Sequence, residues 1–324
     1  MQFSVIICTY NRSNSLSECI ARLALQEAIE PPKWEVVIVD NNSTDGTDKI
    51  IAKLASQYNL NIRYVFEGQQ GLNYARNAGI KASKGEYIAF IDDDILISPN
   101  WLHTMYISLV ENDADAVGGR IHLDKSLSLP SWIQRDMYGF LGHQDFGDET
   151  FQMDGVSRYP FGGNMAFNRR VVDKIGFFNP ELGRRGAGQK RDELYKGSET
   201  DYFHRLTAVN CRIIYQPNAI VFHMVQPFQL KKKYFLTIHY NAGYQKAFND
   251  KSIYHRNLIG IPLFLFPQLI RGLKKYLYQF IIKGSNRAFR QKMVFVHFLG
   301  MMHGYINRKK KSRLAFRNNI SVGP

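Results

Sequence analysis

The strongest constraint on the fold is an alternation of apolar and amphipathic segments in the first part of the chain. Residues 3–8 (FSVIIC), 34–39 (WEVVIV) and 87–91 (YIAFI) are short, mostly apolar and rich in β-branched or aromatic residues, as strands buried on both faces are. The segment after the first strand places apolar residues such as Leu16 and Ile20 at helical spacing. Strands that alternate with helices predict an α/β fold with a mostly parallel sheet flanked by helices.

Further elements follow along the chain. We expect helices over residues 47–57 and 71–82, with a strand at 62–66 between them. Residues 123–159 show no regular period. The later part predicts an ordered segment at 161–167, a Gly- and Arg-rich loop at 183–197, a helix over 199–209, a strand at 212–215 and, after Pro217, another at 219–223.

Three of the predicted strands end in polar or acidic residues: Thr9, Asp40 and Asp92. Ligands of open α/β sheets bind beyond the carboxyl ends of the strands. The sequence therefore predicts a ligand site at this edge of the sheet.

The run Asp92-Asp93-Asp94 follows the strand at 87–91 directly and precedes what reads as the start of an apolar helix. Three adjacent carboxylates repel one another unless a positive group neutralises them. A hard divalent cation, which prefers oxygen ligands and bridges to phosphates, would do this. A solvated acidic loop is the simpler alternative.

Other candidates are weaker when each is taken alone. Asp40 could accept hydrogen bonds from a nucleotide base or ribose, while the loop after it has good helix-capping residues. Arg76 lies within a predicted helix, where an arginine is usually a surface residue. Residues 162–164 (GGN) would let a backbone approach a donor phosphate or an acceptor closely, and Gly163 is the candidate there.

Residues 197–223 combine several groups with chemical potential. Glu199 follows a glycine-rich loop and could act as a general base toward an acceptor hydroxyl. Asp201 lies four residues before Arg205, so helix capping and an ion pair would explain it equally well. His223 ends an apolar strand and is either structural or a further metal ligand.

The order of motifs resembles the family 2 glycosyltransferases of the GT-A (Rossmann-like) fold over residues 3–224. The motifs are VIICTYNR, VVIVDNNSTDGT, GLNYARNAG, YIAFIDDD, FGGNMAFNR and SETDYFHRL…YQPNAIVFH. No single motif is decisive, but their joint order is specific. The resemblance implies an inverting transferase that uses a nucleotide-activated sugar, most commonly a UDP-sugar, with Mg²⁺ or Mn²⁺ as the cofactor.

The resemblance also implies roles for individual residues. Those matching Thr9, Asp40 and Arg76 hold the nucleotide base. Asp92 and Asp94 form the Asp-x-Asp motif, with Asp94 on the metal and Asp92 nearer the ribose. We count Asp92 among the metal ligands as well, and we place Asp92 and Asp93 among the donor-binding residues. The match of Glu199 is the catalytic base, and the match of His223 is a metal ligand in some members.

The chain departs from the family pattern at two places, which limits how far these residue roles can be assigned by resemblance. Many members have Glu-Asp-x-Asp where this chain has Ser198-Glu199-Thr200-Asp201, so the base is either Glu199, which we prefer, or Asp201. The chain also lacks the Gln-x-x-Arg-Trp motif of the processive synthases, which favours addition of a single sugar.

Charge is distributed unevenly along the chain. Residues 226–324 hold 19 Lys and Arg against one acid, Asp250, a net charge of +18, whereas the preceding residues hold 23 basic and 27 acidic residues, a net charge of −4. Basic segments with apolar faces at 274–282 and 293–306 are typical of helices that bind an anionic membrane surface, although a lid or a dimer interface would also fit. The run at 258–270 is shorter than the about 20 residues needed to span a bilayer.

These patterns also predict organisation and location. We expect a catalytic domain at residues 1–225, with nucleotide-sugar binding in 1–122 and acceptor and catalytic residues in 123–225, followed by a basic helical extension at 226–324. The three cysteines form no metal-ligand spacing, and no secretion signal is evident at the N-terminus, so we expect a cytoplasmic protein, peripheral at the inner face of the cell membrane. No nucleic-acid-binding motif accompanies the positive charge.

The preferred function is sugar transfer to a glycan or lipid-linked acceptor in polysaccharide or cell-surface glycan synthesis. A soluble or protein acceptor, with the extension as a lid, is a second interpretation. A catalytically silent nucleotide-sugar- or membrane-binding protein on the same scaffold is the alternative from another class, and the intact acidic run and Glu199 argue against it.

Overall fold

A computed structural model describes the backbone of residues 2–27, 33–58 and 60–320 and the side chains within these ranges up to residue 309. Contacts divide the chain into two compact units. Unit 1 comprises residues 1–128, 135–188 and 197–226, and unit 2 comprises residues 129–134, 189–196 and 227–324.

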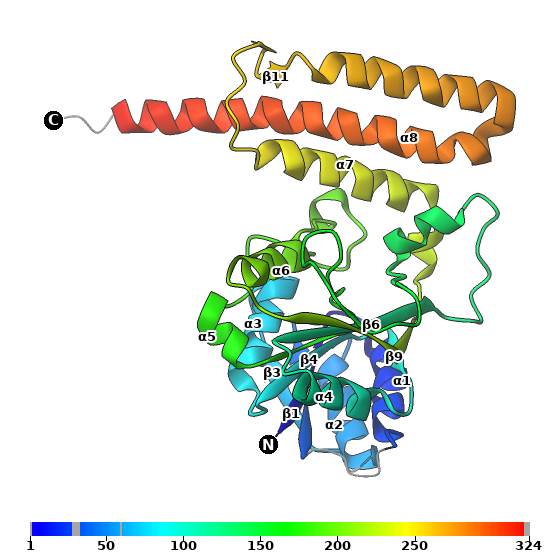
Figure 1. Cartoon of the computed structure of the whole chain (residues 1–324), viewed down its shortest axis with the longest axis vertical. Coiled ribbons are helices and arrows are strands. Elements are labelled where there is room, and N and C mark those ends of the chain that lie inside the picture. The colour runs from blue at the N-terminus through cyan, green and yellow to red at the C-terminus, as the bar shows by residue number, and fades with distance from the viewer. Residues whose placement is uncertain (1, 28–32, 59, 321–324) are drawn as a thin grey trace. The chain divides into compact units, whose positions relative to one another are not determined.

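Unit 1 is built on a mixed sheet of nine strands among the described residues, with the order β3-β2-β1-β4-β8-β6-β9-β5 and β7 paired to β9 (Figure 1). The strands are β1 (Phe3–Thr9), β2 (Trp34–Asp40), β3 (Ile62–Phe66), β4 (Tyr87–Asp92), β5 (Ile95–Ile97), β6 (Ala116–Leu123), β7 (Phe151–Gln152), β8 (Met165–Asn168) and β9 (Ile213–His223). The first four are mutually parallel, as predicted, and β8 then joins β4 in the antiparallel sense. The predicted α/β fold class is confirmed.

Helices cover both faces of this sheet. The helices are α1 (Ser13–Ala24), α2 (Thr47–Tyr58), α3 (Leu72–Ala82), α4 (Trp101–Glu111), α5 (Arg170–Ile175) and α6 (Ser198–Ala208), with the 3₁₀ turn η1 (Arg135–Leu141). Helices α1, α2 and α4 pack with alternate strand residues such as Val5 and Ile7 into one core. Helices α3, α5 and α6 pack with the intervening residues, such as Ile6, into the other. Strands that are apolar on both faces are thus explained by helices on both sides.

Two local predictions were wrong. The apolar helix expected directly after Asp94 is strand β5, which pairs antiparallel with β9, and α4 begins only at Trp101. The two strands expected around Pro217 form the single strand β9. Its register with β6 passes from Gly119↔Gln216 to Arg120↔Ile220, so the residues around Pro217 bulge out of the ladder, where the missing N–H of proline costs no hydrogen bond.

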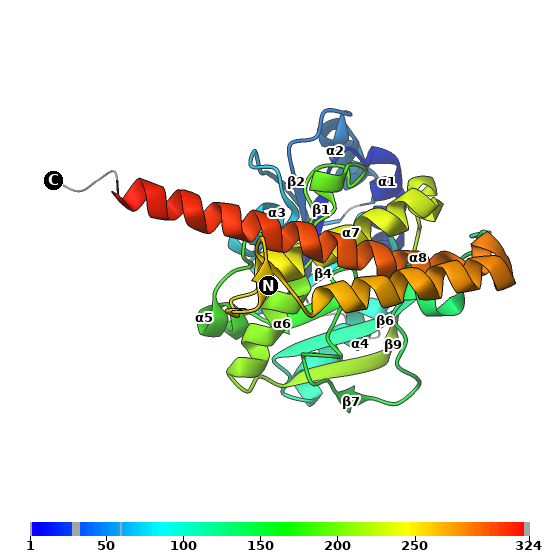
Figure 2. The same cartoon turned by 90° about the horizontal axis from the view of Figure 1, so that it is seen from above.

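Unit 2 is mainly helical. It contains the 3₁₀ turns η2 (Arg191–Glu193) and η3 (Pro227–Leu230), helices α7 (Lys232–Phe248) and α8 (Leu265–Ile320), and the short strand pair β10 (Asn257–Leu258) and β11 (Ile261–Pro262). Non-helical dihedrals at Gly284 (φ 74°, ψ 171°) divide α8 into two limbs. In Figures 1 and 2, α7 lies alongside the second limb.

Three glycines let α7 and the second limb of α8 pack with their backbones close together. A Cβ at Gly243 would lie 2.0 Å from the carbonyl oxygen of His297, and one at Gly300 would lie 2.1 Å from that of Tyr240. Gly304 is as crowded, with the carbonyl oxygen of Tyr244 at 2.4 Å. Larger residues at these positions would force the helices apart. In the part of the chain that the structure describes, no helix is long and apolar enough to cross a membrane.

Candidate active site

Strand ends in unit 1 bring the predicted donor-site residues together. Thr9 ends β1 and lies opposite Asp40, the last residue of β2, in the parallel register of the two strands. On the other side of β1, Cys8 lies opposite Asp92, the last residue of β4. Thr9 and Asp40 are buried, and Asp92 is partly exposed. The expected cluster at the carboxyl edge of the sheet is therefore present.

Asp40 is already well supported by hydrogen bonds. Its Oδ1 accepts from the backbone N–H of Ser43 at 2.9 Å, and its Oδ2 accepts from the hydroxyl of Tyr64 at 3.1 Å. Burial and the adjacent carboxylate of Asp40 raise the pKa of Tyr64 to about 12, so the phenol stays protonated and keeps donating. These contacts hold the Asp40 carboxylate in one orientation.

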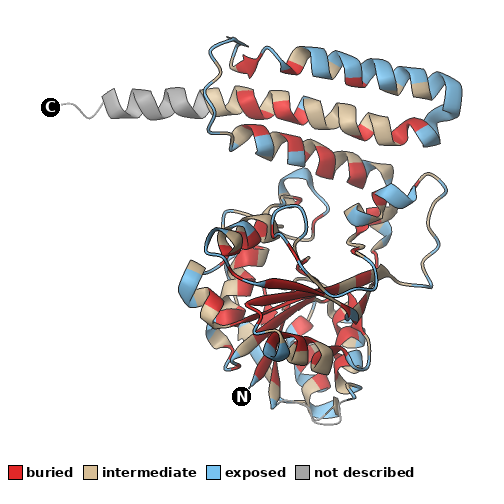
Figure 3. Ribbon diagram, in the orientation of Figure 1, coloured by how far each residue is buried: buried red, intermediate tan, exposed pale blue. Residues whose placement is uncertain are grey.

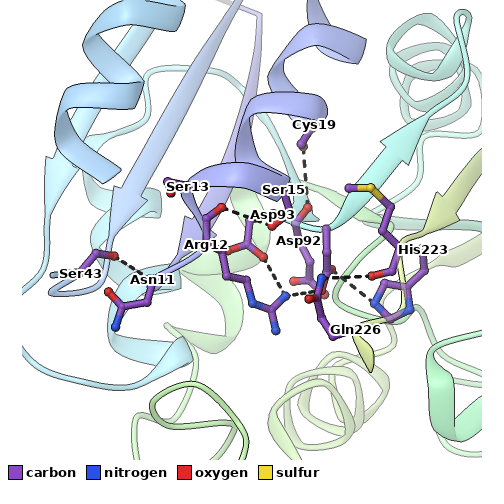
Figure 4. A network of polar contacts seen from close by, with 12 residues as sticks. Asn11, Arg12, Ser13, Ser15, Cys19, Ser43, Asp92, Asp93, His223 and Gln226 are labelled. Atoms are coloured by element: carbon purple, nitrogen blue, oxygen red, sulfur yellow. Dashed lines mark hydrogen bonds and ion pairs between the residues drawn. The ribbon is translucent and has the colours of Figure 1, made fainter. Parts of the chain in front are cut away.

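Two of the three carboxylates at the end of β4 are paired with an arginine that the sequence analysis did not single out. Arg12, in the loop after β1, forms ion pairs with Asp94 and with Asp93, the latter at 3.1 Å between Nη1 and Oδ1 (Figure 4). Burial raises the pKa of Asp93 to about 7, against the effect of Arg12. Burial and repulsion by Asp94 also raise the pKa of Asp92.

Asp94 is the most firmly ionised of the three carboxylates. Its burial alone would raise its pKa, but Arg12 and His223 together hold that pKa below its ordinary value. Arg184 lowers the pKa of Asp92 and Asp94 in the same way, so it too lies near the acidic run.

His223 reaches Asp94 from the last residue of β9. The pairing of β5 with β9 sets Ile95 opposite His223, and the N–H of Met224 donates to the carbonyl oxygen of Asp94 at 2.9 Å. The Nε2 of His223 lies 3.4 Å from Oδ1 of Asp94, and its Nδ1 lies 2.6 Å from the carbonyl oxygen of Leu141. The contact with the carbonyl oxygen of Leu141 fixes the orientation of the imidazole and turns its other nitrogen toward Asp94. Metal-ligating histidines are also oriented by a backbone carbonyl in this way.

The donor set fits a divalent cation bound mainly through a substrate. Among the described residues, no group of three or more His, Cys, Asp or Glu side chains has metal-binding geometry. Asp94 and His223 nevertheless offer one carboxylate and one oriented imidazole side by side. Mg²⁺ in particular is held in many sites by one or two protein carboxylates together with substrate phosphates.

The structure joins two residues that the sequence analysis placed in different roles. Arg76, on α3, is buried and donates from Nη1 to Oγ of Ser198 at 2.8 Å and from Nη2 to Oε1 of Glu199 at 2.9 Å. Its guanidinium also lies 5.3 Å from the ring centre of Phe178. Burial opposes the charge of Arg76, but Glu199 and Asp92 raise its pKa. Arg76 is thus a permanent buried cation that orients the Glu199 carboxylate.

Two adjacent glycines make room for these groups. A Cβ at Gly162 would lie 2.0 Å from Nη2 of Arg76 and 2.4 Å from Oε1 of Glu199, so a larger residue there would require this ion pair to shift. A Cβ at Gly163 would lie 3.2 Å from Oδ2 of Asp92, a tight contact. The backbone of residues 162–163 therefore runs directly between Asp92 and Glu199.

Asp201 points to a different neighbourhood. Its Oδ2 accepts from Nε of Arg205 at 3.0 Å, and the same guanidinium donates to the carbonyl oxygens of Ile175 and Phe177. This is the helix ion pair that the spacing of the two residues suggested. Arg205, which Asp201 orients, therefore ties α6 to the end of α5 and to the residues that follow it.

Sequence reasoning missed Arg12 and did not separate Gly162 from its neighbours. Arg12 follows a strand whose end lies at the same edge as the acidic run, and that position was a usable signal. The closeness of Gly162 to Arg76 and Glu199 depends on three segments far apart in the chain, and no local pattern reports it.

Comparison with known proteins identifies both relatives and similar solved structures. The chain is 26% identical over 273 residues to a glucosyl-dolichyl phosphate glucuronosyltransferase of Haloferax volcanii, covering 80% of this chain and 83% of the relative. Its structure resembles a mannosyltransferase from Pyrobaculum calidifontis in complex with GDP-Man and Mn²⁺, with a TM-score of 0.57, 17% identity and coverage of 100% and 76%.

A second solved structure is S. aureus TarS 1–349 in complex with UDP-GlcNAc, with a TM-score of 0.54, 17% identity and coverage of 97% and 92%. These likenesses identify the GT-A fold, as the resemblance implied. The family model for glycosyl transferase family 2 matches residues 4–176, more than half of the chain. The chain therefore belongs to glycosyl transferase family 2.

Proposed function

We propose that the chain transfers a single sugar, with inversion, from a nucleotide diphosphate donor to a hydroxyl group of a glycan or lipid-linked acceptor. The observation that carries the proposal is the Glu199 carboxylate, which is held by buried Arg76 against Gly162, across the backbone of residues 162–163 from Asp92. A base is thereby fixed close to the acidic run on which the donor would bind. Donor complexes of similar structures, with UDP-GlcNAc and with GDP-Man, support a nucleotide-sugar donor, and we favour a UDP-sugar.

The residues of the chain have separate tasks in this reaction. Glu199 takes the proton from the acceptor hydroxyl while the acceptor oxygen bonds to the anomeric carbon and the bond from that carbon to the donor phosphate breaks. Attack from the face opposite the leaving group inverts the anomeric centre. Thr9 and Asp40 would orient the nucleotide, with Asp92 and Asp93 nearer the ribose and phosphates and Gly163 admitting close backbone approach.

Mg²⁺ or Mn²⁺ would be held by Asp94 and His223, with Asp92 beside them. When bound, the ion would stabilise the negative charge that develops on the leaving nucleotide diphosphate. Arg12 would offset part of the negative charge of Asp93 and Asp94 without the ion.

The acceptor and the location are further parts of the proposal. A lipid-linked acceptor is supported by the dolichyl phosphate substrate in the name of the Haloferax volcanii relative. We propose an anionic membrane surface as a partner, and a cytoplasmic protein peripheral at the inner face of the cell membrane. Residues 1–225 would act as the catalytic domain and residues 226–324 as the membrane-associating extension.

A donor screen tests the first half of the proposal. Thermal unfolding is followed with UDP-, GDP- and dTDP-sugars, each with Mn²⁺ and with a chelator. We expect one nucleotide series to raise the melting temperature, and the chelator to abolish the rise. A folded protein that no donor stabilises would favour the silent scaffold instead.

A matched pair of variants tests the base, with release of the nucleoside diphosphate from the selected donor as the assay. Glu199→Gln keeps an acceptor for Arg76 but removes the basic carboxylate, so release should fall by roughly 10²–10⁴-fold while donor stabilisation persists. Asp201→Asn should remain within a few-fold of the native rate. The opposite pattern would assign the base to Asp201.

A further inference from the structure

The first limb of α8, residues 265–283, has one covered side. Leu265 and Gly272 are buried, and Leu269, Tyr276 and Gln279 at the same helical spacing are partly buried. A Cβ at Gly272 would lie 3.6 Å from the ring of Phe298, so this side packs on the second limb. Figure 3 shows that most of the remaining first limb is exposed.

The uncovered part carries large apolar side chains in a continuous stripe. Its members are spaced at helical intervals and are all exposed: Ile270, Leu273, Leu277, Phe280 and Ile281. Ile281 is 80% exposed, and Leu263 and Phe264, directly before the limb, are exposed as well. A stripe of this length is unusual on a helix that faces only water, because each residue leaves apolar surface hydrated.

Positive charge flanks this stripe without any acidic counterpart. Arg271, Lys274 and Lys275 are exposed next to it, and Lys283 ends the limb. No Asp or Glu follows Asp250 in the sequence. A second copy of this chain on the stripe would bring like charges together, whereas an anionic lipid surface complements them.

The second limb differs, although the sequence suggested the same role for both. Residues 293–306 lie against α7, with Met293, Met301 and Tyr305 buried. Met301 and Tyr305 belong to a core cluster of unit 2, and Phe298, Met302 and Ile306 pack against it. Packing therefore explains the amphipathic pattern of this segment.

We propose that the first limb of α8 is the lipid-docking element and lies in the plane of an anionic membrane. The stripe from Ile270 to Ile281 inserts among the acyl chains, and Arg271, Lys274 and Lys275 lie at the level of the lipid phosphates. A helix with an apolar stripe and a basic flank binds in this orientation. This inference rests on the proposed membrane partnership and adds to it the surface of the protein that contacts the lipid.

Co-sedimentation of the whole chain with vesicles tests the docking element. Vesicles of phosphatidylcholine and phosphatidylglycerol at 3:1 are compared with pure phosphatidylcholine. We expect the native chain to bind the anionic vesicles at least about ten-fold more strongly, since each basic group near the surface contributes roughly five-fold. Leu277→Glu/Ile281→Glu should reduce binding to anionic vesicles by roughly 100-fold, and Lys274→Glu/Lys275→Glu by about ten-fold or more.

Val209→Glu is the matched control, because Val209 is exposed to the same degree as Leu277 but lies in unit 1. It should bind vesicles within two-fold of the native chain, and all variants should melt as the native chain does. Native-like binding by Leu277→Glu/Ile281→Glu would overturn the inference, as would a lipid-free dimer that this variant dissociates. Donor stabilisation without vesicles is measured on the same preparations, so a failure of docking alone leaves the transferase proposal standing.

Discussion

Gly162→Ala is the most direct test of how the site is assembled. The added methyl group would lie 2.0 Å from Nη2 of Arg76 and 2.4 Å from Oε1 of Glu199, and both distances are shorter than any stable contact. Glycine 162 needs no unusual backbone angle, so the substitution acts through space alone. Either the buried guanidinium or the carboxylate must move, and we expect this movement to break their 2.9 Å hydrogen bond.

The size of the effect follows from the burial of Arg76. Separating a buried charged pair costs roughly 3–5 kcal/mol, and the lower end applies here because Glu199 is a quarter exposed and Ser198 still accepts from Arg76. Alanine in place of glycine returns ~0.4–1 kcal/mol by restricting the unfolded chain. We therefore expect a net loss of about 2 kcal/mol in unfolding free energy. Nucleotide release should fall by about 100-fold or more, as the base is displaced.

Gly139→Ala is the matched control, because a Cβ there meets nothing within 4 Å and the backbone angle is ordinary. Urea unfolding and nucleotide release are measured for both variants. In the Glu199→Ala background, Gly162→Ala should cost less than it does alone, since one of its two clashes is gone. Equal stability and activity of the Gly162 and Gly139 variants would refute the assigned packing.

Two further predictions concern buried charge. Arg12→Ala removes the ion pairs with Asp93 and Asp94, although His223 remains beside Asp94. The variant should lose roughly 3 kcal/mol of unfolding free energy at neutral pH, and Mn²⁺ should restore more stability to the variant than to the native chain in urea titrations. An unchanged midpoint would contradict this. Burial lowers the pKa of His239 to about 4, and the nearby charges of Arg290, Lys196 and His297 add to this effect. The unfolded chain therefore binds a proton near pH 6.5, whereas the folded chain binds it only near pH 4. The unfolding free energy should thus fall by up to ~3 kcal/mol as the pH drops from about 6.5 to 4. His239→Gln should flatten that part of the pH profile, and parallel profiles for the two proteins would show that His239 plays no part.

Local patterns were reliable where burial on both faces of the sheet dictates residue type. The first four strands and the helices between them follow the predicted order, because a strand covered on both sides must be apolar throughout. The polar strand ends Thr9, Asp40 and Asp92 were visible for the same reason, as interruptions of that pattern. Strand β5 was missed because three apolar residues have no period that separates strand from helix.

The sequence by itself determined the parallel half of the sheet and the edge at which Thr9, Asp40 and Asp92 gather. It also determined the segregation of positive charge into the last part of the chain. Only the tertiary structure decided that Arg12 pairs with Asp93 and Asp94, and that Arg76 holds Glu199 while Arg205 holds Asp201. It also decided which of two similar amphipathic segments in α8 is packed and which is exposed. The physical reason is the separation along the chain between the residues that interact. Periodicity and strand ends are set by neighbours along the chain, whereas ion pairs and the covering of a helix face depend on residues that the chain brings together only when it folds.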